Sequence, residues 1–331
     1  MLKRWMLGLS AVLLAFGLAA CGAAEEPEAA SGTAQSEAPA QEAPKAEEAP
    51  AERAEEAAPA FPLTITDASG TALTFERAPQ RIVSIAPSET EVLFAIGAGA
   101  SVVAVDDWSD YPAEGVASLP RVGGLEANVE AVLEQEPDLV VAGWTMSGKT
   151  IEELRKLGLT VYAFETNTLD EAIAHIREVG AITGNAAKAE EVAAKMEADR
   201  KLVADAVGGL SDAEKKRVFV EFAPGWTVGK GEFMDELITE AGGVNVADQE
   251  GWYEISEEKI IEADPQVVLY SLGIEGLEGI IKGRAGWDKI DAVANGRVIG
   301  VDDNLISRPG PRITEALVEV AKAVYPEKFG Q

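Results

Sequence analysis

The sequence predicts an α/β protein of two lobes, each with a central, mainly parallel sheet flanked by helices, and with one long helix joining the lobes. Short apolar runs alternate along the chain with longer amphipathic segments. One stretch of sequence recurs in fixed register, and a helical segment separates two series of apolar runs. The alternation predicts the α/β class, and the recurrence predicts that the two lobes are equivalent.

The apolar runs predict the strands. They are rich in Val and Ile on both faces, which is typical of parallel strands covered by helices on two sides. After a strand-like segment at residues 63–66, the first series comprises residues 81–85, 102–105, 139–142 and 160–163. The second series comprises residues 218–222, 267–270 and 298–301.

The repeat joins residues 128–140 to residues 256–268. A polar first residue, a glutamate, an apolar pair, a proline and the start of a strand match in order. Asn128 and Ser256 are good helix N-caps, and Pro137 and Pro265 discourage the residue before them from continuing a helix. Each lobe is therefore expected to contain a matching short helix that leads into a strand.

Apolar residues at helical spacing predict a connecting helix of about 22 residues, roughly 33 Å long. They are Ala189, Val192, Met196, Val203 and Val207. A helix resists bending, so we expect little hinge motion. The predicted division is an N-terminal lobe at residues 61–184, a connecting helix at 185–208 and a C-terminal lobe at 209–331.

The N-terminus predicts export. Lys3 and Arg4 precede an apolar run at residues 5–20, which is shorter than the roughly 20 residues that cross a bilayer. Residues 1–20 are therefore expected to be a signal peptide. Residues 21–60 are rich in Ala, Glu and Pro, and we expect an acidic, disordered tether there. Cys21 is the only cysteine of the chain, which excludes a disulfide within it.

Charge and residue types exclude several classes of protein. The net charge of −29 repels phosphate backbones, so no nucleic-acid partner is expected. His175 is the only histidine, and a direct metal site needs several His, Cys or clustered carboxylate ligands. We interpret His175 as a residue on the surface of a helix. No metal ion and no cofactor is predicted.

An enzyme is the main alternative class, because α/β lobes around a cleft catalyse many reactions. The sequence lacks a Gly-x-Ser-x-Gly elbow and a Walker-type phosphate loop. Gly97 and Gly99 loosely match a dinucleotide motif, but they follow an expected helix at residues 91–96 and are better explained as its C-terminal cap. We therefore predict that the protein is not an enzyme.

Large planar side chains gather after the predicted strands. Open α/β sheets bind ligands beyond the carboxyl ends of their strands, and flat aromatic faces suit a macrocycle or an aromatic chelate. The candidate ligand-binding residues of this kind are Trp108, Tyr111, Trp144, Trp226, Trp252 and Tyr253. The alternative for each of them is that it only packs within its lobe. This alternative carries most weight for Trp144 and Trp226.

Two arginines bracket the rigid turn Pro309-Gly310-Pro311. A guanidinium held there is suited to a phosphate, carboxylate or catecholate oxygen. We favour Arg308 as the ligand-binding residue, because Arg312 opens the next helix and is placed to pair with an acid instead.

Several motifs, in order, resemble the periplasmic-binding-protein class with a single helical backbone, which serves cobalamin, ferric-siderophore and haem importers. They lie at residues 81–91, 109–112, 128–130, 137–140, 242–245 and 308–312. The residues Leu18 to Cys21 likewise resemble a bacterial lipoprotein signal. That resemblance implies cleavage before Cys21 and acylation of this residue, with an ordinary secretory signal as the alternative.

The family resemblance implies roles for particular residues. In relatives that bind cobalamin, a tyrosine, a tryptophan and an arginine at the positions of Tyr111, Trp252 and Arg308 contact the ligand. Another tryptophan of those relatives is absent, because residues 124–126 read Gly-Leu-Glu. Relatives also dock on their transporter through a glutamate of each lobe, which falls on Glu130 and Glu258. The alternative is that both glutamates only favour the positive ends of their helices.

The expected function is therefore that of a monomeric, extracytoplasmic lipoprotein of an ABC importer, anchored to the cell membrane. Its expected partners are a permease dimer with its ATPase and a metal chelate. Cobalamin or another corrinoid and a ferric siderophore rank nearly equal as this ligand. A haem importer is the alternative, followed by a surface sensor or an enzyme.

Overall fold

The computed structural model describes residues 61–124 and 126–330. The predicted signal peptide, Cys21 and the tether at residues 21–60 lie outside the described residues. Within the described part of the chain, no helix is both long and apolar enough to span a bilayer.

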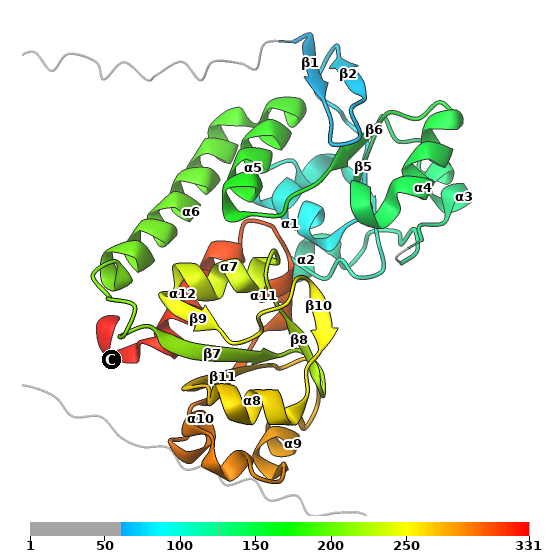
Figure 1. The fold of residues 1–331 in the computed structure, drawn as a ribbon. Coiled ribbons are helices and arrows are strands. Elements are labelled where there is room, and N and C mark those ends of the chain that lie inside the picture. Colours follow the sequence, from blue (N-terminus) through cyan, green and yellow to red (C-terminus); the bar gives the residue numbers. More distant parts are fainter. Residues whose placement is uncertain (1–60, 125, 331) are drawn as a thin grey trace, which may run out of the picture. The chain divides into compact units, whose positions relative to one another are not determined.

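The N-terminal lobe has a sheet of four parallel strands in the order β4-β3-β5-β6. Nearly every residue of β3, β5 and β6 is buried, as expected for strands covered on both faces. A separate antiparallel hairpin, β1–β2, precedes the sheet (Figure 1). The elements are β1 (Leu63–Thr66), β2 (Ala72–Phe75), β3 (Ile82–Ser84), α1 (Pro87–Ala95), η1 (Gly99–Ser101), β4 (Val102–Val105), α2 (Ala113–Val116), α3 (Val129–Glu134), β5 (Leu139–Gly143), α4 (Trp144–Lys156), β6 (Val161–Phe164) and α5 (Leu169–Thr183).

The C-terminal lobe has a second sheet of four parallel strands, in the order β12-β11-β7-β9. A short antiparallel ribbon, β8–β10, accompanies it. The elements are β7 (Lys216–Glu221), β8 (Trp226–Val228), α7 (Phe233–Glu240), β9 (Gly243–Asn245), β10 (Trp252–Glu254), α8 (Glu257–Ala263), β11 (Val267–Ser271), α9 (Leu277–Gly283), η2 (Trp287–Lys289), α10 (Asp291–Ala294), β12 (Val298–Val301), α11 (Asp303–Ser307), α12 (Ile313–Val324) and η3 (Pro326–Lys328).

The two sheets have the same topology. In each lobe the first strand lies between the second and the third, and the fourth strand lies beyond the third. The repeat helices α3 and α8 both lead into the third strand, β5 in one lobe and β11 in the other. The predicted α/β fold of two equivalent lobes is confirmed.

The repeat extends to the hydrogen bonds that begin these helices. The side chain of Asn128 accepts hydrogen bonds from the main-chain N–H groups of Glu130 and Ala131. The Ser256 hydroxyl accepts one from the N–H of Lys259. Both residues are therefore N-caps, which fixes the first turn of each helix and the position of its glutamate.

The repeat also extends to the ends of these helices, where an arginine of the first strand region caps each one. Arg81 donates to the carbonyl oxygens of Gln135 and Glu136, and Arg217 donates to those of Ala263 and Asp264. Among the described residues, Glu136 and Asp264 are the only non-glycine residues with positive φ, at 47° and 43°. The guanidinium groups stabilise these left-handed turns by satisfying carbonyls that the helix leaves unpaired.

The connecting helix α6 (Ala186–Val207) packs against α5 of the first lobe and α12 of the second (Figure 1). Its buried residues include four of the five predicted ones, while Val192 is only partly buried. Gly180 of α5 lets the helices approach closely, because a Cβ there would lie 2.2 Å from that of Ala189. Arg200 of α6 pairs with Asp170 of α5 and Glu240 of α7, so it links both lobes. Little hinge motion stays a prediction.

His175 is not a surface residue, contrary to the sequence-based interpretation. Its side chain is only 6% exposed. Its Nε2 lies 2.6 Å from a carboxylate oxygen of the buried Glu89, and its Nδ1 lies 3.2 Å from the hydroxyl of Tyr162. Its spacing from Ala172 and Val179 places it on the face of α5 that packs on the core, where the partners of its ring nitrogens make burial tolerable.

A buried aspartate ties the β1–β2 hairpin to the first sheet. Asp67 accepts hydrogen bonds from the N–H of Ala163 in β6, from Ser69 and Thr71, and from Arg155. Burial alone would raise the pKa of Asp67, but the hydrogen bonds from Ser69, Ala163 and Thr71 and the charge of Arg155 lower it. This carboxylate therefore contributes stability above its unfolded pKa, and that contribution is lost as the pH falls through the lower folded value.

Replacing this aspartate, Asp67→Asn, is expected to destabilise the protein by about 3 kcal/mol at pH 7, because Arg155 loses its buried partner. The difference from wild type should begin to narrow below about pH 4, where Asp67 of the unfolded chain becomes protonated, and should shrink further as the pH falls toward the lower folded value. Urea unfolding at pH 7 and at about pH 3.5 measures both values. The exposed Glu76→Gln is the control, and an equal loss at both pH values would contradict the role given to the Asp67 charge.

Candidate functional site

The candidate residues lie in the segments that follow the carboxyl ends of the parallel strands. Trp108 and Tyr111 follow β4, and Trp144 follows β5. In the other lobe Trp226 follows β7 and Arg308 follows β12. This edge of a parallel sheet is where open α/β folds bind ligands, so the chain order alone puts these side chains at ligand-binding edges.

Arg308 joins the carboxyl edges of the two lobes. Its Nη1 donates to Asp110 Oδ1 at 2.6 Å and to Glu91 Oε1 at 3.1 Å, and its Nη2 donates to the carbonyl of Trp108 at 3.3 Å. All three acceptors belong to the N-terminal lobe. Although burial opposes it, the two carboxylates raise the pKa of Arg308 above its ordinary value, so the charge is permanent.

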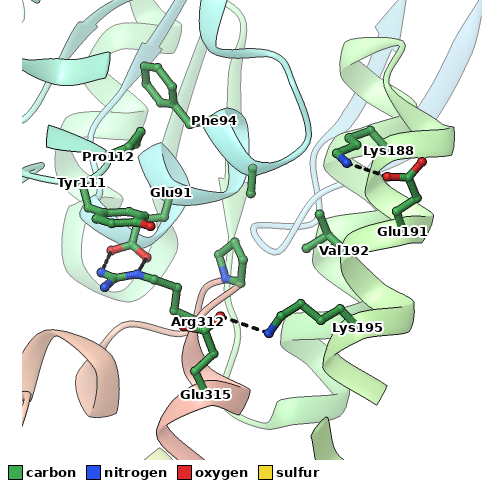
Figure 2. A pocket seen from close by; sticks show the side chains of 12 residues that line it. Glu91, Phe94, Tyr111, Pro112, Lys188, Glu191, Val192, Lys195, Arg312 and Glu315 are labelled. Carbon is green, nitrogen blue, oxygen red and sulfur yellow. Dashed lines mark hydrogen bonds and ion pairs between the residues drawn. The ribbon is translucent and has the colours of Figure 1, made fainter. Parts of the chain in front are cut away.

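Arg312 reaches the same carboxylate as Arg308. Its Nε and Nη2 bind the two oxygens of Glu91 at 2.8 and 2.6 Å, and its guanidinium lies 3.9 Å from the centroid of the Tyr111 ring. Figure 2 shows this stack of Arg312 on Tyr111 beside Glu91. The hydrogen bonds that Arg312 donates to Glu91 raise the pKa of Arg312. The sequence favoured Arg308 over Arg312 as the ligand-binding residue, whereas the structure brings both arginines to the junction of the lobes.

The turn between the two arginines lies close to α1. A Cβ on Gly310 would be 3.1 Å from the carbonyl oxygen of Ser88, in the first turn of that helix. A larger residue at Gly310 would therefore push the turn away from the first lobe. The glycine is explained by this close approach.

A cavity of about 490 Å³ lies beside this junction. Both lobes and α6 contribute to its walls, and Figure 2 shows Tyr111 and Arg312 opposite the side chains of α6. Its volume is in the range of small-molecule sites. The lining residues are Glu91, Phe94, Ala95, Tyr111, Pro112, Lys188, Glu191, Val192, Lys195, Pro311, Arg312 and Glu315.

The tryptophans predicted to bind ligand do not line this cavity. Trp108 is 60% exposed, and Trp226 and Trp252 are each 43% exposed. In the β8–β10 ribbon Trp252 pairs with Val228 and Glu254 pairs with Trp226, which puts the two tryptophans diagonally on one face. Phe222 supports Trp252 edge-on, with ring centroids 4.9 Å apart. The ribbon therefore presents two open indole faces at the carboxyl edge of its lobe.

Two other candidate residues have structural surroundings. Trp144 begins α4 and packs against the core of the first lobe, and Tyr253 packs against the core of the second. Burial raises the pKa of Tyr253. Both side chains are only partly exposed, so the ligand-binding role predicted for them stays a prediction.

A buried carboxylate shapes the loop that contains Trp108 and Tyr111. Asp106 accepts hydrogen bonds from the main-chain N–H groups of Trp108 and Ser109 at 3.0 and 2.6 Å. Burial raises its pKa more than these hydrogen bonds lower it. Arg121 donates to the carbonyl oxygens of Asp106 and Ser109. The loop is therefore held from both sides before any ligand arrives.

Two buried glutamates that position the site were not predicted from the sequence. Glu91 holds both arginines, and Glu221 is fully buried at the end of β7. Glu221 accepts hydrogen bonds from the N–H of Gly225 and from Arg284, which fixes the turn before Trp226. An acid inside an otherwise apolar segment was the available signal, because such an acid needs a buried partner.

Two equivalent α/β lobes that meet at their carboxyl edges beside a lined cavity define a two-lobed ligand-binding protein. Within the described part of the chain, no three His, Cys, Asp or Glu residues are grouped so that they could hold a metal ion. The family model of the periplasmic binding protein matches residues 82–305. The chain belongs to this family, and to its class in which one long helix links the lobes.

Two curated relatives and one solved structure illustrate the similarity. The uncharacterized ABC transporter substrate-binding lipoprotein YvrC of Bacillus subtilis is 35% identical over 277 residues, which cover 81% of this chain and 87% of that protein. A cobalamin-binding protein of Halobacterium salinarum is 32% identical, over 80% of this chain and 74% of that one. The periplasmic heme-binding protein RhuT of Roseiflexus is 28% identical with a TM-score of 0.67, over 75% of this chain and 99% of RhuT.

The family decides the class of function. It consists of substrate-binding proteins of ABC transporters, which bind their ligands without converting them. The prediction that this chain is not an enzyme is therefore confirmed by its family. The names of the relatives give different ligands, cobalamin for one and haem for another. The comparisons therefore show the class of protein but not which ligand this chain binds.

Proposed function

We propose that this protein is a lipid-anchored substrate-binding protein that captures a metal chelate outside the cytoplasm and delivers it to an ABC importer. The ligand is cobalamin or another corrinoid, or a ferric siderophore. The observation that carries the proposal is the set of open aromatic faces, Trp108 and Tyr111 in one lobe and Trp226 and Trp252 in the other. Each face stands at the carboxyl edge of a parallel sheet.

These aromatic residues suit a broad, flat ligand better than a small polar one. A fully buried aromatic side chain covers roughly 150–250 Å², and a well-stacked pair adds about 1 kcal/mol. Each of the four side chains is at least 43% exposed, so each has surface left to cover. In the second lobe Phe222 fixes the Trp252 ring before binding. A ligand held between the lobes would cover faces from both.

Relatives of this chain support the choice of ligand class. One is named for cobalamin and another for haem. The tryptophan that cobalamin-binding relatives are expected to carry before the Asn-x-Glu helix is replaced by Gly124 and its neighbours, which keeps the ferric siderophore level with cobalamin. Haem is the second candidate, favoured by the flatness of the aromatic faces. Of the side-chain types that ligate a haem iron, these four residues include a tyrosine, Tyr111, and neither His nor Cys.

We also propose that Glu130 and Glu258 dock on a permease dimer. Both are exposed at the N-termini of the repeat helices, and among the described residues neither carboxylate has an ion-pair partner. One turn further on, Leu133 and Ile261 are exposed to almost the same extent, 37% and 38%. Equivalent charges beside equivalent apolar side chains, one set on each lobe, suit a partner with two-fold symmetry.

The membrane anchor completes the proposal. Cys21, outside the described residues, is the proposed site of acylation, and residues 21–60 are the proposed tether between the membrane and the lobes. YvrC, which is 35% identical, is named as a lipoprotein. The folded part is proposed to act as a monomer on the outer side of the cytoplasmic membrane.

A binding screen tests the proposed function. The purified chain in detergent is titrated with cyanocobalamin, cobinamide, ferrichrome, ferrioxamine, a ferric tricatecholate and haemin while tryptophan fluorescence is recorded. We expect one of these chelates to quench the fluorescence saturably at one molecule per protein, and to be recovered unchanged. Free Fe³⁺ and the metal-free siderophores are the controls. Failure of every chelate to bind, or conversion of one into product, would contradict the proposal.

A further inference from the structure

The charged residues at the junction of the lobes bear on the charge of the ligand. Two arginines, Arg308 and Arg312, stand at the carboxyl edges where a ligand is proposed to bind. An anionic chelate, such as a ferric tricatecholate, gains most from a guanidinium whose donors are free. The question is therefore whether these two guanidinium groups are available to an anion.

The hydrogen bonds of both guanidinium groups are already taken up by groups of the protein. Glu91 is only 2% exposed and binds both arginines, with contacts of 2.6 and 2.8 Å to Arg312 and 3.1 Å to Arg308. Asp110 binds Arg308 at 2.6 Å, and the Trp108 carbonyl accepts from its other terminal nitrogen. Each arginine is therefore neutralised by carboxylates, and Arg312 is further covered by the ring of Tyr111.

More negative charge surrounds this cluster. Arg308 also interacts electrostatically with the carboxylate of the buried Asp106, and the carboxylate of Asp302 interacts electrostatically with Arg312. Arg121 adds one further positive charge, but its terminal nitrogen donates to main-chain carbonyls of the Trp108 loop. Four carboxylates thus outnumber three guanidinium groups, and the chain as a whole has a charge of −29. An incoming anion meets a field that repels it.

We infer that the site selects metal chelates without net negative charge, and that Asp110 is a specificity-determining residue because it occupies Arg308. The inference rests on the proposed function and narrows its ligand to a corrinoid or a neutral or cationic ferric hydroxamate. Glu91 acts with Asp110, but it is buried and joins the lobes. Asp110 is exposed on a loop, so its replacement changes the charge balance with less effect on the fold.

The test compares two ferric siderophores of similar size and different charge, neutral ferrichrome and a trianionic ferric tricatecholate. The affinity of the full chain in detergent for each is measured by fluorescence titration. Wild type should bind ferrichrome at least about ten-fold more tightly, and added salt should weaken that preference because it screens the repulsion. In Asp110→Asn, the ratio of affinities should move toward the tricatecholate by about ten-fold, because the charge of Arg308 is then no longer balanced by that of Asp110.

Asp107→Asn is the matched control. It removes the same charge from the same loop, at an exposed carboxylate for which the described residues offer no arginine contact, and it should shift the ratio by less than about three-fold. Equal shifts in both variants, or tighter binding of the tricatecholate by wild type, would overturn the inference and leave the proposed function standing. If no chelate of the wider panel binds, both fall. Glu91→Gln is a second variant that removes a negative charge from the arginines. Its melting temperature reports whether the lobes stay folded.

Discussion

Replacing both docking glutamates, Glu130→Arg and Glu258→Arg, is expected to reduce uptake of the bound chelate by at least about 100-fold in cells with the cognate importer. A permease subunit that receives a glutamate is expected to be basic at that point, so each reversal would set like charges against one another, which costs several kcal/mol at an interface. Ligand affinity should stay within about two-fold, because both residues lie on α3 and α8 and not among the aromatic residues. Uptake of labelled chelate and fluorescence titration measure the two effects.

The matched control reverses the charge of one exposed glutamate in each lobe at a position outside α3 and α8. The two substitutions are Glu153→Lys on α4 and Glu319→Lys on α12. It changes the net charge by the same amount. Its uptake should remain near wild type. Each single docking variant should give an intermediate defect, because one lobe can still engage its permease subunit. Wild-type uptake by the double docking variant would refute the paired-glutamate assignment.

Removing one aromatic face from each lobe, Tyr111→Ala with Trp252→Ala, is expected to weaken ligand binding by about 100-fold or more. Each truncation removes about 100 Å² of apolar contact, worth roughly 2.5 kcal/mol at about 25 cal/mol per Å², before any stacking energy is counted. Each side chain is more than 40% exposed, so truncation should cost the folded protein little beyond the stack of Tyr111 on Arg312. Isothermal titration with the chelate that the screen identifies measures the loss.

Two exposed leucines provide the control for this pair. Leu157 and Leu202 are 53% and 52% exposed, on the loop after α4 and on α6. Their replacement by alanine should leave affinity within about two-fold, because neither belongs to the candidate site. If the aromatic double variant binds as well as wild type, the ligand does not lie between these faces.

The fold was predictable because local patterns and tertiary structure agree. The Val and Ile runs that are apolar on both faces form the central strands, and the sequence repeat alone predicted α3 and α8 with their N-caps. Short segments escaped prediction. β9 contains only Gly243, Val244 and Asn245, and β8 and β10 are three residues each, too short for a period to be recognised.

The types of residue in the candidate site could be predicted from the sequence, but the contacts between them could not. Aromatic residues at the ends of strands could be chosen because the topology of α/β sheets determines where such ends lie. That Glu91 would bind both Arg308 and Arg312 could not be foreseen, because these partners lie more than 200 positions apart in the chain. The burial of His175 was missed for the same reason, since its partner Glu89 belongs to another helix.

The central claim is that a single chelate is held between the two lobes by aromatic faces from both. A crystal structure of the protein with the chelate that it binds tests this claim most directly. We expect the ligand to contact Tyr111 or Trp108 of the first lobe and Trp226 or Trp252 of the second, with Glu130 and Glu258 left free on the outside. A ligand that touches one lobe alone, or that lies against Glu130 or Glu258, would contradict it.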